Sequence, residues 1–394
     1  MKKKIIYIVF FICLFALAML PIIGCEKQAY AMTMQTDTKE NLPLTPNGFG
    51  EYLTEYNSGK VLYQYNADSR HEIASMVKIM TANLIFEAID EGKLSLDEKI
   101  VISKEAADMG GSQMFLDSGQ SYSVNDLIKG IIVVSANDAS YAMAERLGGS
   151  VEGFVSMMNK RAKELGMNNT LFANCTGLPC DKEQYSSAKD VNIMTRQLMS
   201  HEKYFEYASI WMEDYTHPSG RVTQLVNTNK LLKQYNGCLG GKTGYTDKAG
   251  HCLSACAGRN NLKVVATIVG GSDSKSRFNQ VRSMFDYAFA NYVNKIYYKK
   301  GDIAGSIKVA KSPVKEIEVA IAEDIAHFSK VGDKSQEIEL MLPEKIKAPI
   351  KKGDVIGQAK YNLDGKEYSV NLIALEDARK SSFWDIVKDI SNKW

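Results

Sequence analysis

The chain has 394 residues, of which 45% are hydrophobic and 24% are charged. This balance is typical of a globular protein that is long enough for one large and one smaller domain. The formal net charge is only +2, so the composition implies neither nucleic acid nor an acidic polymer as a partner.

The N-terminus has the pattern of a secretory signal peptide over residues 1–31. Three lysines precede an apolar run from Ile5 to Ile23. Two cleavage sites stay open: Cys25 ends a segment that resembles a lipobox and would be lipidated, whereas Ala31 ends an A-x-A site that would release Met32. A third alternative is an uncleaved anchor, since about 20 apolar residues span a bilayer. Each alternative exports the rest of the chain to the outer face of the membrane or the cell wall.

After a polar linker over residues 32–41, residues 42–295 are predicted to form an α+β domain in which an antiparallel sheet is covered by helices. Two predicted hairpins lie at the ends of this segment, with strands at 50–56 and 61–66 and at 245–257 and 262–269. Apolar residues recur at helical spacing between and after them, in the stretches 75–92, 154–165 and 278–288. Strands at both ends with helices between them favour a sheet with a helical cover.

The character of the chain changes after residue 298. Residues 299–376 contain short alternating runs, such as 317–321, 338–342 and 368–375, separated by glycine-containing turns. This pattern predicts a small all-β domain.

Residues 380–394 are predicted to form an amphipathic helix. Its apolar residues lie at helical spacing on one face, namely Phe383, Ile386, Val387, Ile390 and Trp394. Docking on a membrane surface is the favoured interpretation, because aromatic residues beside Arg379 and Lys380 suit an interfacial helix. Packing of this face on the β domain is the alternative.

Neither the cysteines nor the histidines form a recognisable framework. Five cysteines follow the signal segment: Cys175, Cys180, Cys238, Cys252 and Cys256. An odd number without regular spacing favours buried free thiols, although a bond between Cys175 and Cys180 stays open. The five histidines lack metal-ligand spacing, so neither a metal nor another cofactor is expected.

Three short strings in a fixed order carry the chemistry: Ser75 to Lys78 (S-x-x-K), Ser135 to Asn137 (S-x-N) and Lys242 to Gly244 (K-T-G). Together they indicate a serine enzyme that forms an acyl intermediate. Each string alone is weak evidence, because S-x-x-K also starts at four other serines: Ser186, Ser200, Ser272 and Ser312. Ser75 differs from these because it opens the long apolar stretch that predicts a buried helix.

The first string suits nucleophilic catalysis. Residues three apart share one helix face, so Lys78 can contact Ser75. A lysine has an ordinary pKa of about 10.4 and is not a base at neutral pH. Apolar neighbours and a second cation such as Lys242 would lower that pKa and let Lys78 take the proton of Ser75. At a helix start, the N–H of Ser75 can also serve as an oxyanion donor.

The chain resembles the low-molecular-mass penicillin-binding proteins, specifically the D-alanyl-D-alanine carboxypeptidases, over nearly its whole length. Besides the three strings, the resemblance includes the glycine-containing segment 110–119, Asn137-Asp138-Ala139, and Gly177-Leu178 ahead of 185–190. It implies a β-lactamase/transpeptidase-like fold followed by a small β domain and an amphipathic tail.

The resemblance also implies roles for individual residues. Ser75 would be the nucleophile and Lys78 the base, Ser135 would pass a proton to the leaving amine, and Asn137 would contact a substrate amide. The substrate carboxylate and the oxyanion would be bound by the segment Lys242, Thr243, Gly244 and Tyr245. Minor departures from the family pattern are Ile73, Val77 and Leu239 to Gly241.

The implied activity is removal of the terminal D-alanine from peptidoglycan stem peptides through an acyl-enzyme on Ser75. Stem peptides, β-lactam inhibitors and a membrane surface are the expected partners. A serine β-lactamase and a catalytically inactive wall-binding protein are the alternatives, and the lifetime of a penicillin adduct distinguishes them.

Overall fold

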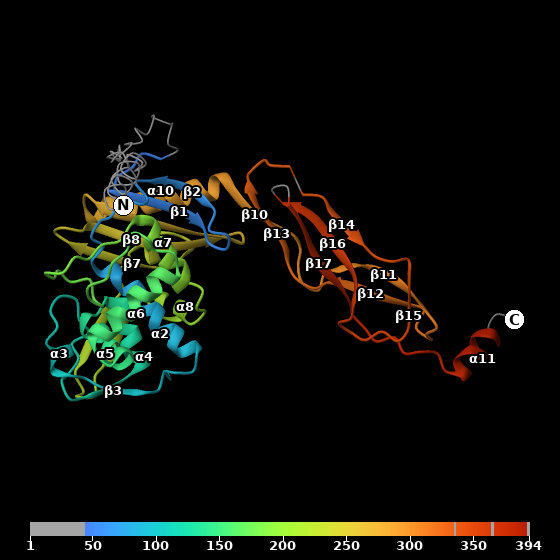
Figure 1. Ribbon diagram of the computed structural model, residues 1–394, viewed down its shortest axis with the longest axis horizontal. Helices are drawn as coiled ribbons and strands as arrows, with labels where there is room; N and C mark the ends of the chain where they lie inside the picture. Colours follow the sequence, from blue (N-terminus) through green and yellow to red (C-terminus); the bar gives the residue numbers. More distant parts are fainter. Residues whose placement is uncertain (1–43, 335, 364–365, 392–394) are drawn as a thin grey trace, which may run out of the picture. The chain divides into compact units, whose positions relative to one another are not determined.

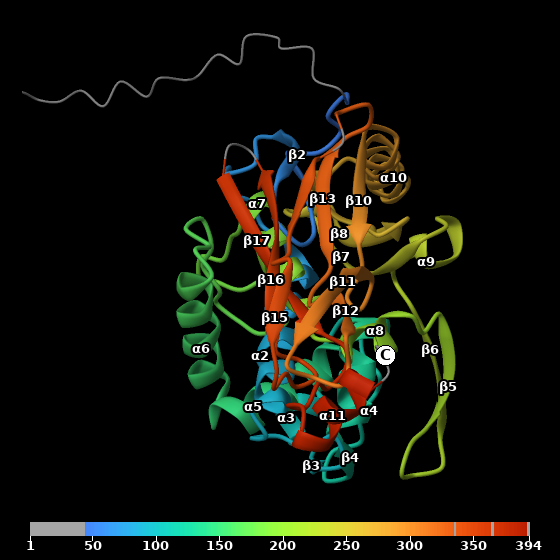
Figure 2. The same ribbon diagram turned by 90° about the vertical axis from the view of Figure 1, so that its right-hand side faces the viewer.

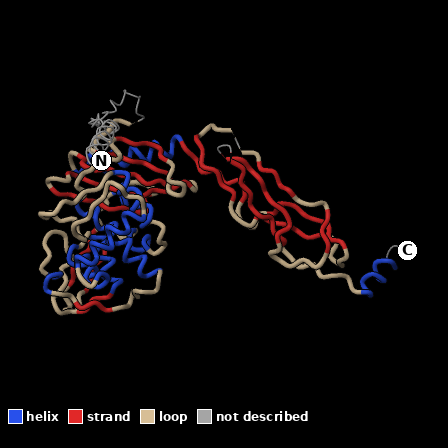
Figure 3. The backbone as a smooth tube through the Cα atoms, in the orientation of Figure 1, coloured by secondary structure: helices blue, strands red, loops and turns tan. Residues whose placement is uncertain are grey.

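A computed structural model describes residues 44–391, apart from 335 and 364–365. The expected signal peptide (1–31), the lipidation candidate Cys25, the linker (32–41) and Trp394 lie outside the described residues. Helices and strands are mixed through residue 291, and strands dominate from there to a last short helix (Figure 3).

An antiparallel sheet forms the centre of the first region. Its strand order is β2-β1-β9-β8-β7, and every neighbouring pair is antiparallel. The strands are β1 (Gly50–Glu55), β2 (Val61–Tyr65), β7 (Cys238–Thr246), β8 (Gly250–Arg259) and β9 (Leu262–Gly271). The sheet therefore joins the start of the domain to its end, as the sequence predicted.

Helices cover both faces of this sheet (Figure 1). Along β8, Leu253 and Ala255 pack in the same apolar cluster as α10 (Ser274–Asn291), whereas Cys252 and Cys256 point into the cluster of the opposite face. This alternation follows from the two-residue period of a strand. The helices on the opposite side include α2 (Lys78–Asp90), α4 (Val124–Lys129), α5 (Asn137–Gly148), α6 (Val151–Glu164), α7 (Ala188–Leu198) and α8 (Tyr204–Ala208). The predicted α+β fold is confirmed.

Shorter elements complete this region. Two small antiparallel sheets pair β3 (Lys99–Val101) with β4 (Ser121–Ser123), and β5 (Met212–Thr216) with β6 (Val222–Val226). The β5–β6 hairpin extends away from the neighbouring helices (Figure 2). Single turns of helix are η1 (Ala74–Val77), α3 (Lys104–Ala107), η2 (Gly130–Val134, a π-helix) and α9 (Leu231–Gln234).

The second predicted hairpin needs a correction. The segment 245–257 is not one strand, because residues 247–249 reverse the chain between β7 and β8. Ala249 N donates to Thr246 Oγ1 at 3.0 Å, and Gly250 has a φ of 62°, as a tight turn requires. The Lys-Thr-Gly string therefore lies within an edge strand of its own, β7, which forms a hairpin with β8.

The C-terminal region is an all-β structure with its own apolar cluster. One sheet has the order β14-β16-β17-β12-β11-β15, in which β11 and β15 are parallel, and a second pairs β10 with β13. The strands are β10 (Tyr292–Tyr298), β11 (Ile303–Ala310), β12 (Glu316–Ile321), β13 (Ile325–Lys330), β14 (Ile338–Met341), β15 (Lys345–Lys347), β16 (Val355–Leu363) and β17 (Lys366–Ala374).

The last helix, α11 (Phe383–Ser391), exposes its apolar residues. The exposed fraction is 73% for Phe383 and 76% for Trp384, and Ile386, Val387 and Ile390 are exposed as well. The structure therefore does not bury this face against the β domain.

The cysteines that the structure describes are all free. Cys175, Cys252 and Cys256 are buried, as predicted. Cys238 is half-buried and Cys180 is exposed, so for these two the prediction of burial was wrong. Cys180 lies in an irregular loop, where no helix or sheet covers it.

Candidate active site

Ser75 lies in a tight turn rather than on the α-helix itself. It belongs to the 3-10 turn η1, and the α-helix begins at Lys78. Ala74, directly before the serine, has a φ of 46°, a left-handed conformation that is strained for any residue except glycine. Lys78 Nζ still contacts Ser75 Oγ at 3.2 Å. The expected serine–lysine pair is therefore present, but a strained turn positions the serine.

Two glycines let neighbouring backbone approach this turn. A Cβ on Gly177 would collide with Ala74 O, and a Cβ on Gly244 would collide with Ile73 O. Gly177 also has a φ of 80°, which favours glycine. Loop 165–187 and strand β7 consequently hold the turn through close backbone packing.

Lys78 is buried without an acidic partner. Its Nζ donates to the backbone oxygen of Thr176 at 2.6 Å. Desolvation by burial lowers the pKa of Lys78 to about 7, although Cys175 and Asp138 act in the opposite direction. The desolvation that the sequence predicted is thus observed. A lysine with a pKa near 7 is largely neutral at slightly higher pH, where it can accept a proton.

The second string follows the π-helix η2 (Gly130–Val134). Ser135 ends this element with a φ of 65°, and Asn137 begins α5. Short π-helical segments often occur at functional sites. Here the segment turns the chain so that Ser135 Oγ accepts a hydrogen bond from Lys242 Nζ at 2.8 Å.

Asn137 is held by the loop beside it. Its backbone N–H donates to Ser112 O at 2.7 Å, and its Nδ2 donates to Gly110 O at 2.6 Å. The side-chain oxygen Oδ1 is buried and has no partner in the described part of the protein. A buried acceptor without a donor is unfavourable, so this oxygen is available to an N–H group of a ligand.

Asp138, on α5, binds the same loop. Its fully buried carboxylate accepts the backbone N–H of Met114 at 3.2 Å and that of Leu116 at 3.0 Å. Charge-assisted bonds of this kind are stronger than neutral ones. The loop therefore has a defined position relative to α5.

The third string contributes a second buried lysine. Besides Ser135, Lys242 Nζ contacts the backbone oxygen of Thr243 at 2.8 Å, and Thr243 Oγ1 donates to Thr228 Oγ1 at 2.8 Å. Desolvation by burial, followed by repulsion from Lys78 and Arg277, lowers the pKa of Lys242 well below its usual value. Tyr245, next along β7, is 54% exposed.

The site collects basic side chains without pairing them with acids. Arg277 is mostly buried and donates to Gly244 O at 3.0 Å and to Cys252 O at 3.2 Å. None of the ion pairs between described residues involves Lys78, Lys242 or Arg277. Buried basic groups that lack acidic partners favour the binding of an anionic ligand, which would stabilise their protonated forms.

The decoy at Ser186 does not form a comparable pair. Ser186 Oγ bonds Thr170 Oγ1 at 2.8 Å, whereas Lys189 Nζ donates to Asp68 at 3.0 Å. Lys189 and Asp68 thus form an ordinary surface ion pair.

The structure brings Ser75, Lys78, Ser135 and Lys242 into two hydrogen-bonded pairs, and it places Thr243 to Tyr245 along the same edge strand. The sequence did not indicate Thr176, Thr228 or Arg277. Thr176 acts through its backbone, which no sequence pattern reveals. Thr228 lies in an Asn-Thr-Asn segment typical of a loop, and Arg277 lies on a helix that the sequence marked only as apolar.

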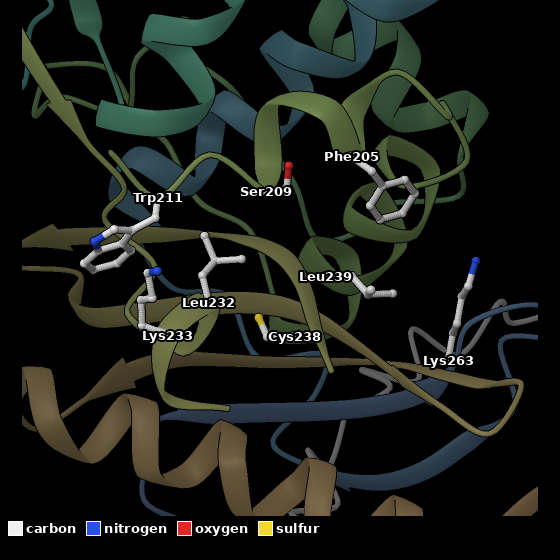
Figure 4. Close-up of a pocket in the computed structure, with 8 residues that line it drawn as sticks. All are labelled: Phe205, Ser209, Trp211, Leu232, Lys233, Cys238, Leu239 and Lys263. Carbon is white, nitrogen blue, oxygen red and sulfur yellow. The ribbon is translucent and has the colours of Figure 1, made fainter. Parts of the chain in front are cut away.

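A separate cavity lies near the start of β7 (Figure 4). Its volume is about 380 Å³, and its lining residues are Phe205, Ser209, Trp211, Leu232, Lys233, Cys238, Leu239 and Lys263. None of the three strings contributes a side chain to it. Within the described ranges, no group of three or more His, Cys, Asp or Glu has the arrangement of a metal site.

Comparison with protein families gives two matches. Residues 50–273 match the family described as D-alanyl-D-alanine carboxypeptidase. Residues 292–380 match the family described as penicillin-binding protein 5, C-terminal domain. The first match contains all three strings.

Individual relatives agree with these matches. D-alanyl-D-alanine carboxypeptidase DacF of Bacillus subtilis (strain 168) is 39% identical to this chain, over 91% of this chain and 92% of the relative. DacC of Escherichia coli (strain K12) is 32% identical, over 87% of this chain and 88% of the relative. The crystal structure of penicillin binding protein 5 from Haemophilus influenzae has a TM-score of 0.64 and 31% identity, over 86% of this chain and 100% of that chain.

Proposed function

The chain belongs to the D-alanyl-D-alanine carboxypeptidase family and is a serine enzyme of peptidoglycan metabolism; we propose that its reaction proceeds through an acyl-enzyme on Ser75, outside the cytoplasm. The observation that carries the residue assignment is the pair of hydrogen bonds Lys78–Ser75 and Lys242–Ser135. Family membership favours this activity over the serine β-lactamase and the inactive wall-binding protein.

Acylation begins with proton transfer from Ser75 Oγ to neutral Lys78 Nζ. The contact of 3.2 Å and the pKa of about 7 both support Lys78 as the base. Ser75 Oγ then attacks the carbonyl carbon of the penultimate D-alanine. The N–H groups of Ser75 and Tyr245 are the proposed donors to the oxyanion that forms.

The leaving D-alanine needs a proton on its amine as the peptide bond breaks. Ser135 Oγ–H supplies that proton, and Lys242 Nζ, at 2.8 Å from this oxygen, returns one to Ser135. An ester on Ser75 remains. Lys78 first releases the proton that it took from Ser75, and Lys242 regains the one that it gave to Ser135, so that the net transfer is one proton from Ser75 to the amine. Neutral Lys78 then accepts a proton from the water that attacks the ester and passes it to Ser75 Oγ as the ester bond breaks, which regenerates the serine and releases the shortened peptide.

Substrate recognition follows from the unpaired groups of the site. The carboxylate of the last D-alanine is the proposed ligand of Lys242 and Thr243, because Lys242 is buried without an acidic partner and a bound carboxylate would stabilise its protonated form. Asn137 Oδ1, which is buried without a donor, would accept an amide N–H of the stem peptide. The edge strand β7 can pair with the extended backbone of the stem peptide, while Gly244 lets the turn that contains Ser75 approach this strand closely.

Penicillins present a carboxylate beside a strained amide, so they would occupy the same groups and acylate Ser75. The decisive experiment combines labelling by a fluorescent penicillin with release of D-alanine from a peptide that ends in D-Ala-D-Ala. Ser75→Ala should abolish both. Ser200→Ala changes an exposed decoy serine and should alter neither.

The outcomes of this experiment are distinct. A stable adduct with D-alanine release supports the proposal, and rapid turnover of the penicillin would support the lactamase. Persistent labelling of Ser75→Ala would move the nucleophile to another serine and overturn the site.

The location of the enzyme is part of the proposal. Export rests on the pattern of residues 1–31, with lipidation at Cys25 and cleavage after Ala31 as the two products to be distinguished by mass spectrometry. Attachment to the outer face of the cytoplasmic membrane would use the exposed apolar side chains of α11. Among the residues from 44 to 391 that the structure describes, none of the helices is both long enough and apolar enough to span a bilayer.

A further inference from the structure

Thr228 touches the elements that carry the second and the third string. It lies in a bend between β6 and α9, and its side chain is half-buried. Its backbone N–H donates to Val133 O at 3.2 Å, close to Ser135, and its Oγ1 accepts from Thr243 Oγ1 at 2.8 Å. No sequence pattern pointed to this residue.

The backbone around Thr228 is well fixed. Asn227 and Asn229 are buried on either side of it. Asn227 Nδ2 donates to Ile210 O at 2.9 Å, and its Oδ1 accepts the N–H of Asn229, also at 2.9 Å. The hydroxyl of Thr228 is therefore presented to Thr243 by a rigid loop.

The geometry creates a conflict over one proton. A threonine hydroxyl has a single O–H donor and two acceptor positions. In this structure Thr243 donates its proton to Thr228. An ionised carboxylate only accepts hydrogen bonds. Thr243 therefore must withdraw its proton from Thr228 before it can donate to the carboxylate of a substrate.

We propose that Thr228 is a positioning residue for carboxylate recognition, which exchanges its role from acceptor to donor when the substrate binds. Thr243 O–H turns toward the carboxylate, and Thr228 O–H turns to donate to the Thr243 oxygen. Only hydroxyl rotations occur, so no covalent bond changes and no proton leaves its oxygen. This inference rests on the proposed contact between Thr243 and the carboxylate.

The exchange keeps the Thr243 oxygen paired in both states. Without the Thr228 hydroxyl, the substrate-bound Thr243 would have a nearly buried acceptor position facing an apolar group, which is unfavourable. A donor at that position also polarises the O–H bond of Thr243 and strengthens its bond to the carboxylate. Thr228 thus acts on the substrate only through Thr243.

The test uses full-length variants and two substrates, an N-acylated peptide that ends in D-Ala-D-Ala and its C-terminal amide. Thr228→Val replaces only the hydroxyl with a methyl group and keeps the backbone bond to Val133. We expect it to raise KM for the free acid about fivefold, the net worth of one hydrogen bond, with kcat nearly unchanged. Hydrolysis of the amide should stay as in the parent enzyme, and Thr228→Ser should restore the parent KM.

A double variant identifies the path of the effect. If Thr228 acts through Thr243, Thr228→Val should add nothing to the KM of Thr243→Val. If the two substitutions raised KM independently, so that their factors multiplied in the double variant, the inference would be overturned. Equal losses of activity on the acid and the amide would also overturn it, as would a Thr228→Ser variant that does not restore the parent KM. Melting curves of all four variants check that each one folds.

The same data separate this inference from the proposed function. If Thr243→Val alone does not distinguish acid from amide, the carboxylate assignment of Thr243 is wrong, and the proposed function fails at that residue. If Thr243→Val distinguishes them but Thr228→Val does not, only the role of Thr228 is wrong.

Discussion

The nucleophile region and the C-terminal helix depart from ordinary side-chain burial in opposite directions. Around Ser75, the basic side chains of Lys78 and Lys242 are buried without acidic partners. On α11, large apolar side chains are exposed instead. Both arrangements are unfavourable in water. Each marks a place where something outside the chain completes the structure, an anionic substrate in one case and, on our proposal, a membrane in the other.

Replacement of the base should have the largest effect. Lys78→Met keeps an unbranched side chain but removes the amine, so acylation by penicillin should slow by about 10²- to 10⁴-fold, the usual contribution of a general base. Stopped-flow labelling measures this rate. Lys189→Met, at a decoy lysine in an exposed ion pair, is the control and should leave the rate unchanged. A rate within about tenfold of the parent, short of the lower limit of about 10²-fold for such effects, would contradict Lys78 as the base.

The same variant should change how stability depends on pH. Burial lowers the folded-state pKa of Lys78 to about 7, so between pH 7 and the unfolded value of about 10.4 the unfolded chain binds more protons. Stability of the parent therefore rises with pH across this window. Lys78→Met should flatten the rise when urea unfolding is measured at pH 7 and pH 10. Parallel curves for parent and variant would show that the lysine is not desolvated.

The rate of acylation should depend on pH through the protonation state of the same lysine. Only neutral Lys78 accepts a proton, so the second-order rate of acylation should fall about tenfold for each pH unit below 7 and level off above it. Rates between pH 5 and 9 test this, after the fold is verified at each pH. A rate that does not change from pH 5 to 8 would assign proton removal to another group.

The exposed helix gives the next effect in size. Ile386→Glu should weaken the binding of a chain that starts at Met32 to phospholipid vesicles by about tenfold or more, because a buried apolar side chain contributes about 1.5–3 kcal/mol. Lys388→Gln makes the net charge more negative by the same amount on the polar face and is the matched control. Co-sedimentation measures binding. Equal losses in both variants would point to charge alone, and D-alanine release in solution should be unaffected.

The smallest effect concerns how the nucleophile turn is held. Gly177→Ala introduces a methyl group against Ala74 O, whereas Gly92→Ala has a similar positive φ and meets no atom within 4 Å. The control should lose only about 1 kcal/mol of stability, the ordinary cost of a left-handed residue. Gly177→Ala should lose more, together with penicillin labelling. Equal stability and full labelling in both would show that this backbone contact does not position Ser75.

The sequence predicted what depends on local pattern. The strings around Ser75, Ser135 and Lys242 lie in the same site, and alternating or helical spacing identified β1, β2, α6 and α10. The errors arose where geometry overrides pattern. The α-helix begins only at Lys78, since the left-handed Ala74 is part of a tight turn before it. The sequence pattern did not separate β7 from β8, because β7 is rich in glycine, which is uncommon in strands.

The remaining features depend on contacts between distant segments. Thr176 contributes a backbone oxygen, which every residue has, and Thr228 contacts Thr243 only because the loop after β6 returns to β7. The pKa of Lys78 was predicted in direction because its sequence neighbours are apolar. The opposing influence of Asp138 was not predicted, since that residue belongs to α5.

These long-range contacts determine when in folding the enzyme becomes reactive. Lys78 and Thr176 are 98 positions apart in the chain, and Ser135 and Lys242 are 107 positions apart. Closing such loops is slow and requires most of the domain to be ordered first. A refolding chain should thus regain helical circular dichroism well before it reacts with penicillin. The rate at which refolding chains gain the ability to react with penicillin therefore measures the final step of folding. Covalent labelling also distinguishes native molecules from compact intermediates, which do not react.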